Sequence, residues 1–479
     1  MKQSVKWLLT AIASVYMKRC LFAGLIALSF SLEASWVYTE TNTVANGVSK
    51  GFITDGKWTF YALREKGSVL DIKIDATNGI SFDSDEPAEI DFSEIEGGYR
   101  ITEFNAGKSD SPLRHFATKV IAPHCVKMDG ADGFRNNLNL TTVELSSDPL
   151  PQLTGDRLFY YCSNLREFSP RRIAGTSVRT GLFQGCSSLA GKLEFPSSTQ
   201  FTGKDNFNGC SSLQEVEAPN VKVLPQSCFF GCASLTNVVL SSSIEQIGVN
   251  AFNGTAIPAE VAQRILANSV TLLGKYQDSK DFYQGGCFSL CTGLSGKLVW
   301  QMPNLITNVV PYACFSDAVL GKMVFKTPID TFEAEAFYNT HGADGAATEL
   351  YLHKQVPALV RKKAFMRKSA PYTKVYVSGN IDGWLDAIEK NANHNFIRKE
   401  DFQNREWAGS KHASVDGWGG ITDVMAKDTT MCKKEGAGNA AVFTVLDKRV
   451  IAFAFVYGSS GGGCWILDPR TDGMQLKVR

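Results

Sequence analysis

Short stretches in which apolar and polar residues alternate recur along most of the chain. They include residues 143–145, 238–240, 350–352 and 375–377. A hydrophobic period of two is typical of a β-strand with one buried face. Because a strand this short cannot bury its inner face alone, we expect the copies to stack at roughly 4.8 Å into parallel sheets over one continuous core.

An aromatic residue precedes these stretches at a regular distance. The phrase Phe-x-Gly-Cys-Ser-Ser-Leu occurs at 183–189 and 207–213, and a shorter form follows at 230–235. Members of this aromatic column are 22 to 28 residues apart, except for one interval of 36, and most of these spacings are those of leucine-rich repeats. The sequence therefore predicts a β-rich leucine-rich-repeat solenoid of short parallel strands, with a ladder of stacked phenylalanines in its core. The column consists of Phe134, Phe159, Phe183, Phe207, Phe229, Phe252, Phe288, Phe315, Phe337 and Phe365.

The repeat array is expected to span residues 115–395. Residues 35–114 lack the repeated phrase but contain alternating stretches bounded by Gly and Asp, and we expect an N-terminal β module there. Residues 396–479 are expected to form a C-terminal β-rich module, with strands near 441–446 and 450–457. The predicted architecture is thus a solenoid flanked by two small β modules.

Two helices are predicted within the array. The long interval between Phe252 and Phe288 contains a segment that starts with Pro258, a residue favoured in the first turn of a helix. We therefore expect a helical insertion near 258–271. A second amphipathic pattern near 382–393 predicts a capping helix, since the terminal repeat of a solenoid must cover its last apolar face.

Residues 1–34 resemble an export signal, with the true start at Met17. Lys18 and Arg19 form a basic segment, residues 20–32 are apolar, and Ala34 follows as a small residue at a cleavage point. The alternative is a longer uncleaved anchor that includes the upstream apolar run. Because two charges at the centre of such an anchor are costly in a bilayer, cleavage is favoured. We expect a secreted or cell-surface protein that contacts a membrane only through this signal.

The charge balance argues against a nucleic-acid partner. The chain has 49 basic and 48 acidic residues, for a formal net charge of +1, and shows no basic stripe. The excess of phenylalanine, 30 residues against 14 tyrosines and 8 tryptophans, is explained by the aromatic column.

Most of the twelve cysteines also fall into columns of the repeat. One column contains Cys162, Cys186, Cys210, Cys232 and Cys291, and a second contains Cys228, Cys287 and Cys314. A free thiol behaves as a small hydrophobic group, so we expect buried structural cysteines there; the alternative is a bridge between neighbouring repeats. Outside the array, Cys432 and Cys464 are the best candidates for a disulfide.

The sequence contains no arrangement of residues that predicts catalysis or a cofactor. The six histidines are scattered, without metalloprotease or nucleophile signatures, and the cysteine pairs lack the spacing of zinc sites. The acidic stretch at 83–96 is interpreted as a solvated loop, with a Ca²⁺ site as the alternative. We therefore expect no enzyme activity, no metal and no cofactor.

One residue of each strand is expected to point outward between two buried ones. In chain order this column is Glu144, Ser169, Glu194, Glu217, Val239, Val299, Val324, Tyr351 and Tyr376. Its first part is mostly acidic and its second part apolar to aromatic. Because exposed apolar stripes mark interaction sites and tyrosine is enriched in interfaces, the residues from Glu194 onward are the candidate ligand-binding face. The alternative is that a terminal module packs over this face.

The repeated phrase, followed by Val-x-Leu, resembles the BspA-like leucine-rich repeats of bacterial surface proteins. The pattern weakens toward the C-terminal repeats, where Ala318, Thr340 and Lys368 replace the cysteine. The resemblance implies a secreted or surface-displayed protein and an adhesion-type role, with an extracellular protein or glycan as partner. An alternative function is binding of, or activity on, glycans through the C-terminal module, where Trp407, Trp418 and Trp465 could stack on sugars.

Overall fold

The chain divides into two units, Met1–Ser35 and Trp36–Arg479. The computed structural model describes residues 35–43, 48–64, 67–107, 110–175, 177–196, 198–266, 269–275, 286–361, 363–365, 367, 373–377, 439–445, 452–457 and 463–468. The predicted export signal (1–34) and the predicted capping helix (382–393) lie outside these residues. None of the helices in the described ranges has the length and hydropathy needed to span a bilayer.

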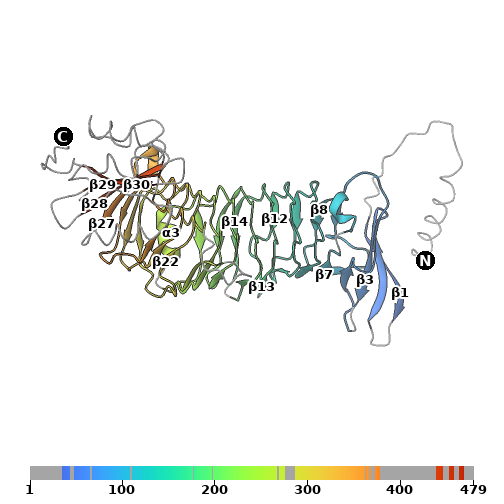
Figure 1. Cartoon of the computed structure of the whole chain (residues 1–479). Coiled ribbons are helices and arrows are strands. Elements are labelled where there is room, and N and C mark those ends of the chain that lie inside the picture. The colour runs from blue at the N-terminus through green and yellow to red at the C-terminus, as the bar shows by residue number, and fades with distance from the viewer. Residues whose placement is uncertain are drawn as a thin grey trace, which may run out of the picture. The chain divides into compact units, whose positions relative to one another are not determined.

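One row of parallel strands, here called the front strands, carries the predicted outward residues (Figure 1). In each strand a central apolar residue is buried and its two neighbours point away from the core, as the period of two requires. The row comprises β6 (Ala88–Asp91), β8 (Ala117–Ile121), β10 (Thr142–Glu144), β12 (Glu167–Ser169), β14 (Gly191–Glu194), β16 (Leu213–Glu217), β18 (Asn237–Val239), β21 (Lys297–Trp300), β23 (Lys322–Phe325), β25 (Glu349–Tyr351) and β27 (Thr373–Val377).

A second row of shorter strands closes the other side of the core, and its members also pair in parallel. These back strands are β9 (Lys127–Asp129), β11 (Gln152–Leu153), β13 (Ser177–Val178), β15 (Gln200–Phe201), β17 (Val223–Leu224), β19 (Gln246–Gly248), β20 (Leu272–Lys275), β22 (Val309–Val310), β24 (Thr331–Phe332) and β26 (Leu359–Val360).

The phenylalanine column stacks inside the solenoid as predicted. Neighbouring rings are stacked with centroids 5.1 to 6.1 Å apart from one end of the column to the other. Every ring of the column is buried. Each repeat contributes one phenylalanine ring to the ladder and one strand or helix to the front row. The order of the stacked rings therefore gives the order of the repeats along the solenoid. The predicted leucine-rich-repeat solenoid is confirmed.

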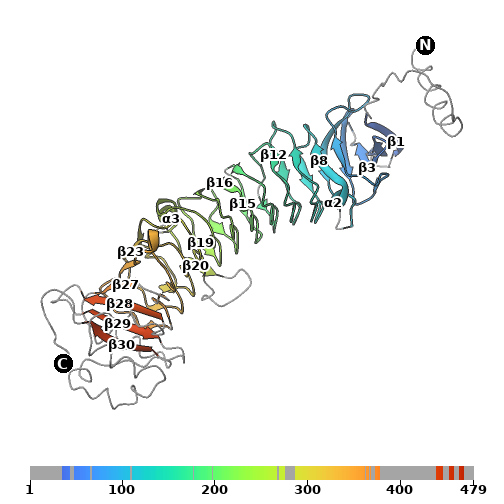
Figure 2. The same ribbon diagram turned by 90° about the horizontal axis from the view of Figure 1, so that it is seen from above.

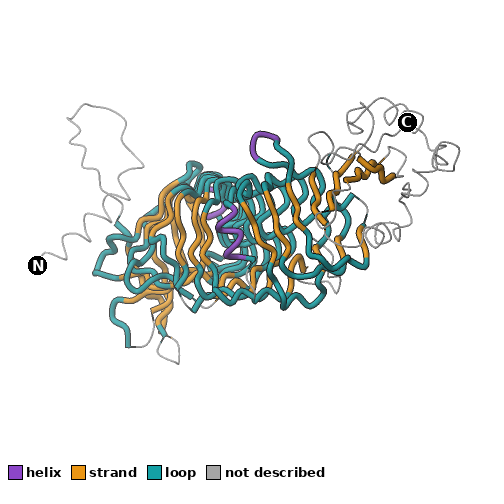
Figure 3. The backbone as a smooth tube through the Cα atoms, turned by 90° about the vertical axis from the view of Figure 1, so that its left-hand side faces the viewer, coloured by secondary structure: helices purple, strands orange, loops and turns teal. Residues whose placement is uncertain are grey.

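The long interval after Phe252 contains helix α3 (Ala259–Ile265), shorter than the predicted 258–271, with Pro258 at its N-cap. The helix takes the place of a front strand in this repeat and buries Val261 and Ile265 (Figure 3). The ring ladder is not interrupted, since Phe252 stacks on Phe229 and on Phe288 at 5.6 and 5.4 Å. The helix therefore occupies one rung of the front row. A short 3₁₀ helix, η1 (Ala343–Gly345), lies in a smaller insertion.

The N-terminal strands merge with the solenoid. Strands β1 (Val37–Thr43), β2 (Ser49–Thr54), β3 (Trp58–Arg64) and β4 (Asp71–Asp75) form an antiparallel meander, and β5 (Ile80–Phe82) also pairs with β3. Strand β4 then pairs in parallel with β7 (Arg100–Asn105), which continues into β9 and β11. The short helix α2 (Leu113–Phe116) precedes β8. Parallel stacking thus begins before residue 115.

Three strands continue the front row at its C-terminal end. Strand β28 (Asn439–Val445) pairs in parallel with β27, and β29 (Ala452–Tyr457) and β30 (Gly463–Asp468) follow in antiparallel order (Figure 2). The strands predicted at 441–446 and 450–457 are confirmed, with slightly different ends. These strands extend the sheet edge to edge, whereas the sequence left open that this module packs over the front face.

Candidate functional site

The predicted outward residues form straight columns because the front strands pair in register. Glu144 lies beside Ser169, Glu194 beside Glu217 and Val239, and Val299 beside Val324, Tyr351 and Tyr376. We call these nine residues the tyrosine column. Glu144 and Ser169 are exposed, whereas the other seven are half-buried, since each is flanked by its neighbours in the column.

The C-terminal part of this column is a stack of one lysine and two tyrosines. The rings of Tyr351 and Tyr376 are stacked, with centroids 4.3 Å apart and 14° between their planes. The Nζ atom of Lys322 lies 3.9 Å from the centroid of Tyr351 in a cation–π contact. The Tyr351 hydroxyl donates to Glu349 Oε2 at 3.3 Å. Because the ring faces cover one another, a ligand here would contact ring edges and hydroxyl groups.

Both tyrosine hydroxyls stay protonated at neutral pH. Burial, followed by the charge of Glu349, raises the pKa of Tyr376 to about 12. The same causes raise the pKa of Tyr351. Because Tyr351 already donates its only proton to Glu349, the lysine ammonium is the main donor that the column offers to a ligand, and it suits hydrogen-bond acceptors such as carboxylate, sulfate or carbonyl oxygens.

A second outward column, which the sequence analysis did not single out, lies beside the first. It contains the residue before the central buried residue of each front strand, and we call it the charged column. Its members could be recognised only once the strand register was known. They are Lys192, Glu215, Asn237, Lys297, Lys322, Glu349 and Lys374.

The front face has opposite net charges on the two sides of α3. On β14 and β16, Lys192 Nζ lies 2.8 Å from Glu217, 2.9 Å from Glu194 and 3.7 Å from Glu215. Hydrogen bonds to Glu217 and then Glu194 raise the pKa of Lys192. This lysine is thus surrounded by a local excess of carboxylates.

On the front strands that follow α3, the net charge is positive. Lys297 and Lys374 are exposed, and neither forms an ion pair within the described ranges. Lys322 Nζ lies 4.0 Å from Glu349 Oε2. The front face therefore changes from acidic on β10–β16 to basic and aromatic on β21–β27.

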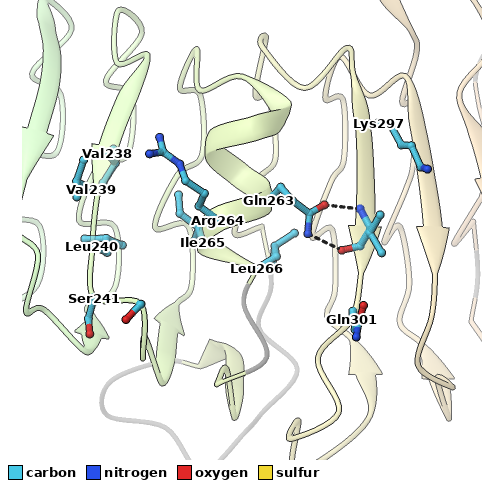
Figure 4. A pocket seen from close by; sticks show the side chains of 12 residues that line it. Val238, Val239, Leu240, Ser241, Gln263, Arg264, Ile265, Leu266, Lys297 and Gln301 are labelled. Atoms are coloured by element: carbon cyan, nitrogen blue, oxygen red, sulfur yellow. Dashed lines mark hydrogen bonds between the residues drawn. The ribbon is translucent and has the colours of Figure 1, made fainter.

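A depression of about 750 Å³ separates these halves, between β18, α3 and β21 (Figure 4). Val239, Leu240 and Val299 contribute apolar walls. The side-chain amide of Gln263 pairs with the edge of β21: Nε2 donates to the Val299 carbonyl at 3.0 Å and Oε1 accepts from the Val299 N–H at 2.5 Å. On the other side, Arg264 Nη2 donates to Asn237 Oδ1 at 3.0 Å.

Comparison with known protein families identifies the type of repeat in the array. Six copies of the BspA type leucine rich repeat region match residues 152–277. This segment is a BspA-type leucine-rich repeat region. No curated protein matches the whole sequence significantly.

Three solved structures are similar to this chain. A leucine-rich cell surface protein from Faecalibacterium prausnitzii is 15% identical, with a TM-score of 0.32 and coverage of 70% of this chain and 97% of that one. A leucine-rich repeat protein from Bacteroides ovatus is 13% identical, with a TM-score of 0.29 and coverage of 75% and 100%. The pneumococcal vaccine antigen PcpA is 13% identical, with a TM-score of 0.27 and coverage of 71% and 96%.

The cysteines of the BspA-type repeats are structural, as predicted. All nine cysteines in the described ranges are free and buried, so the alternative of bridges between neighbouring repeats is not realised among them. In the main column each thiol donates a weak hydrogen bond to the carbonyl of the phenylalanine one repeat earlier, as Cys186 does to Phe159 at 3.1 Å and Cys210 to Phe183 at 3.0 Å. Burial raises the pKa of Cys162 and of Cys210 to about 12.

Several other candidates of the sequence analysis remain predictions. Cys432, Trp407 and Trp418 lie outside the described residues, and the side chains of Cys464 and Trp465 on β30 are likewise outside them. The disulfide between Cys432 and Cys464 and a sugar-binding C-terminal module are therefore untested. In the described part of the chain, no three His, Cys, Asp or Glu side chains gather where they could hold a metal ion.

Proposed function

We propose that this chain is a non-catalytic scaffold, displayed outside the cytoplasm, that binds an extracellular protein or glycan through the front face on β21–β27. The observation that carries the proposal is the in-register stack of Lys322, Tyr351 and Tyr376. Polar groups at the fixed spacing of the strands are suited to an extended ligand with repeated polar groups. The BspA-type repeats and the predicted export signal support the location.

The chemistry of this face indicates which ligand groups it would recognise. Protonated tyrosine hydroxyls and lysine ammonium groups are all hydrogen-bond donors. Lys297 lies on the strand before the stack and Lys374 lies on the same strand as Tyr376, with Glu349 between Lys322 and Lys374 in the charged column. We therefore expect ligands that carry carboxylate or sulfate groups to bind more tightly than neutral ones, with an affinity that falls as the salt concentration rises.

The direct test is a binding screen with the chain from residue 35 to its end. The immobilised protein is exposed to arrays of extracellular-matrix proteins and of neutral and acidic polysaccharides. The proposal predicts saturable capture of at least one acidic member, and competition by the same ligand in solution. Capture that is equal for the wild type and for a heat-unfolded sample would contradict it.

A further inference from the structure

The order of charges in the charged column is self-complementary about helix α3. Before the helix the column contains Lys192, Glu215 and Asn237, and after it Lys297, Lys322, Glu349 and Lys374. Counting strands outward from α3, Glu215 on one side is matched by a lysine on the other side. Lys192 is matched by an acidic residue. The matched positions are Glu215 with Lys322 and Lys192 with Glu349, while the polar Asn237 is matched with Lys297.

The ring ladder makes this count unambiguous on both sides of the helix. The repeats of Phe229, Phe252 and Phe288 are successive rungs, and the front elements of these repeats are β18, α3 and β21. At about 4.8 Å per rung, β12 and β27 are the same number of rungs from α3 in opposite directions. The face from β12 to β27 then extends for roughly 40 Å.

The tyrosine column agrees with the same centre. Val239 and Val299 lie on either side of α3 and line the apolar depression. Further out, Glu194 is matched with Tyr351, and Glu217 is matched with Val324. An apolar centre with polar and charged surroundings is the usual composition of a protein interface.

We propose that the front face binds a second copy of this chain, antiparallel, about a two-fold axis at α3. This rests on the proposed function, because it names a partner for the same face. With a two-fold axis parallel to the front strands, the repeats of the second copy run in the opposite order along the solenoid. Each column of one copy then faces the same column of the other copy. Glu215 of one copy then faces Lys322 of the other, and the two-fold repeats this pair.

The residues that would form these contacts are accessible. The side chains of Glu215 and Lys322 are 30% and 39% exposed, and those of Lys192 and Glu349 are 37% and 33% exposed. A two-fold axis that runs along the solenoid through the charged column would instead place each residue of this column opposite its own copy, so that like charges meet, which costs free energy. The pattern therefore favours one orientation.

The expected association is modest. Exposed ion pairs contribute little individually and are screened by salt. We expect a dimer that dissociates at low protein concentration and at high ionic strength. Sedimentation velocity of the full chain from residue 35, over a range of concentrations at low and physiological salt, measures this directly.

Charge reversal supplies the decisive variants. Lys322→Glu and Glu215→Lys each place like charges opposite one another twice in the dimer, and each should weaken self-association at least tenfold. An equimolar mixture of the two variants should dimerise again, because both pairs are then of opposite sign. The same rescue is expected in the double variant. Lys50→Glu, on the N-terminal meander, is the control and should leave the dimer unchanged.

Three outcomes would overturn the inference. The wild type could remain a monomer at every concentration, the reversals could leave association unchanged, or the mixture could fail to restore it. Recovery of the mixed dimer also shows that both variants fold. The proposed function is judged separately by ligand capture on the monomeric Glu215→Lys variant, which retains the face on β21–β27. If that variant captures ligand while the wild type never dimerises, only the dimer is wrong.

Discussion

The rings of Phe207 and Phe229 stack with their centroids 5.5 Å apart and 14° between their planes. The backbone joins the same two repeats, since the Phe207 N–H donates to the Cys228 carbonyl at 2.9 Å. Ring stacking and hydrogen bonding therefore couple neighbouring repeats at the same place. In a solenoid, where each repeat contacts only its neighbours, such interfaces carry most of the stability.

Replacing Phe207 with alanine should remove two stacking contacts and leave a cavity in the middle of the ladder. We expect a loss of about 3–5 kcal/mol in the free energy of unfolding. Chemical denaturation followed by circular dichroism measures it. The control is Phe52→Ala on the N-terminal meander, because Phe52 is 42% exposed and its loss should cost far less. Equal effects of the two substitutions would argue against the ladder.

The buried thiols should be protected from reagents in the folded chain. A version that starts at residue 35 and carries Cys432→Ser and Cys464→Ser retains only the nine cysteines that are free and buried. We expect a thiol reagent to label them slowly under native conditions and completely after denaturation. Rapid native labelling of several of these thiols would contradict the packing.

The same thiols should make the fold sensitive to alkali. Burial raises the pKa of Cys162 and of Cys210 from 9.0 to about 12. The unfolded chain loses these protons first, so this contribution to stability is complete below about pH 9 and is lost as the pH rises toward 12. Stability measured from pH 8 to 11 should fall less steeply in Cys162→Ala/Cys210→Ala than in the wild type. If stability fell equally steeply with pH in both proteins, ionisation of these two thiols would not be the cause.

Asp132 and Arg157 link two repeats on the turn side of the solenoid. Arg157 Nε lies 2.8 Å from Oδ1 and Nη2 lies 2.9 Å from Oδ2 of Asp132. Burial opposes ionisation of Asp132, but the hydrogen bonds and charge of Arg157 outweigh it and hold the pKa of this carboxyl below its ordinary value of 3.8. The stabilisation is present above that pH and is lost as the pH falls through the lowered value.

Asp132→Asn should therefore destabilise the chain most at neutral pH. The difference from the wild type should shrink as the pH falls below 3.8, the ordinary value for this carboxyl. Denaturation midpoints from pH 2.5 to 7 measure it. Asp129→Asn is a suitable control, since the ion pair of Asp129 with Lys127 is longer, at 3.9 Å. A pH-independent difference would point to packing and not to the ion pair.

Gln263 should stabilise the contact between α3 and β21. Its amide pairs with both the N–H and the C=O of Val299, so Gln263→Ala leaves two backbone groups without their partners. We expect a loss of about 1–3 kcal/mol, the usual cost of an unsatisfied buried polar group. Arg264→Ala on the same helix is the matched control, with a smaller expected effect. Hydrogen exchange at the Val299 amide should accelerate only in the Gln263 variant.

The sequence was sufficient to predict the repeated part of the fold. The spacing of Phe183, Phe207 and Phe229 predicted the ladder, and their alignment with Cys186 and Cys210 predicted free, buried thiols. These predictions succeeded because each repeat has the same environment, so that one residue type recurs at each buried position.

The remaining features depend on contacts that no single repeat contains. The sequence predicted a helix after Pro258, but not that α3 would occupy a rung in place of a strand, with Gln263 completing the edge of β21. It placed Tyr351 and Tyr376 in one column, but the stacking of their rings on each other follows from the register of β25 and β27. The charged column was missed because surface residues vary freely and become a pattern only after alignment in space.

The claim that the front face on β21–β27 binds a ligand is tested most directly by replacing its two tyrosines. Ligand capture is compared, by surface plasmon resonance against the best acidic ligand of the screen, between the wild type, Tyr351→Ser/Tyr376→Ser and the control Tyr160→Ser/Tyr161→Ser on the turn side. Circular dichroism and denaturation confirm that all three are folded.

We expect the Tyr351→Ser/Tyr376→Ser variant to lose at least tenfold in affinity, while the control binds as the wild type does. Unchanged affinity in the folded Tyr351→Ser/Tyr376→Ser variant would contradict the choice of this face.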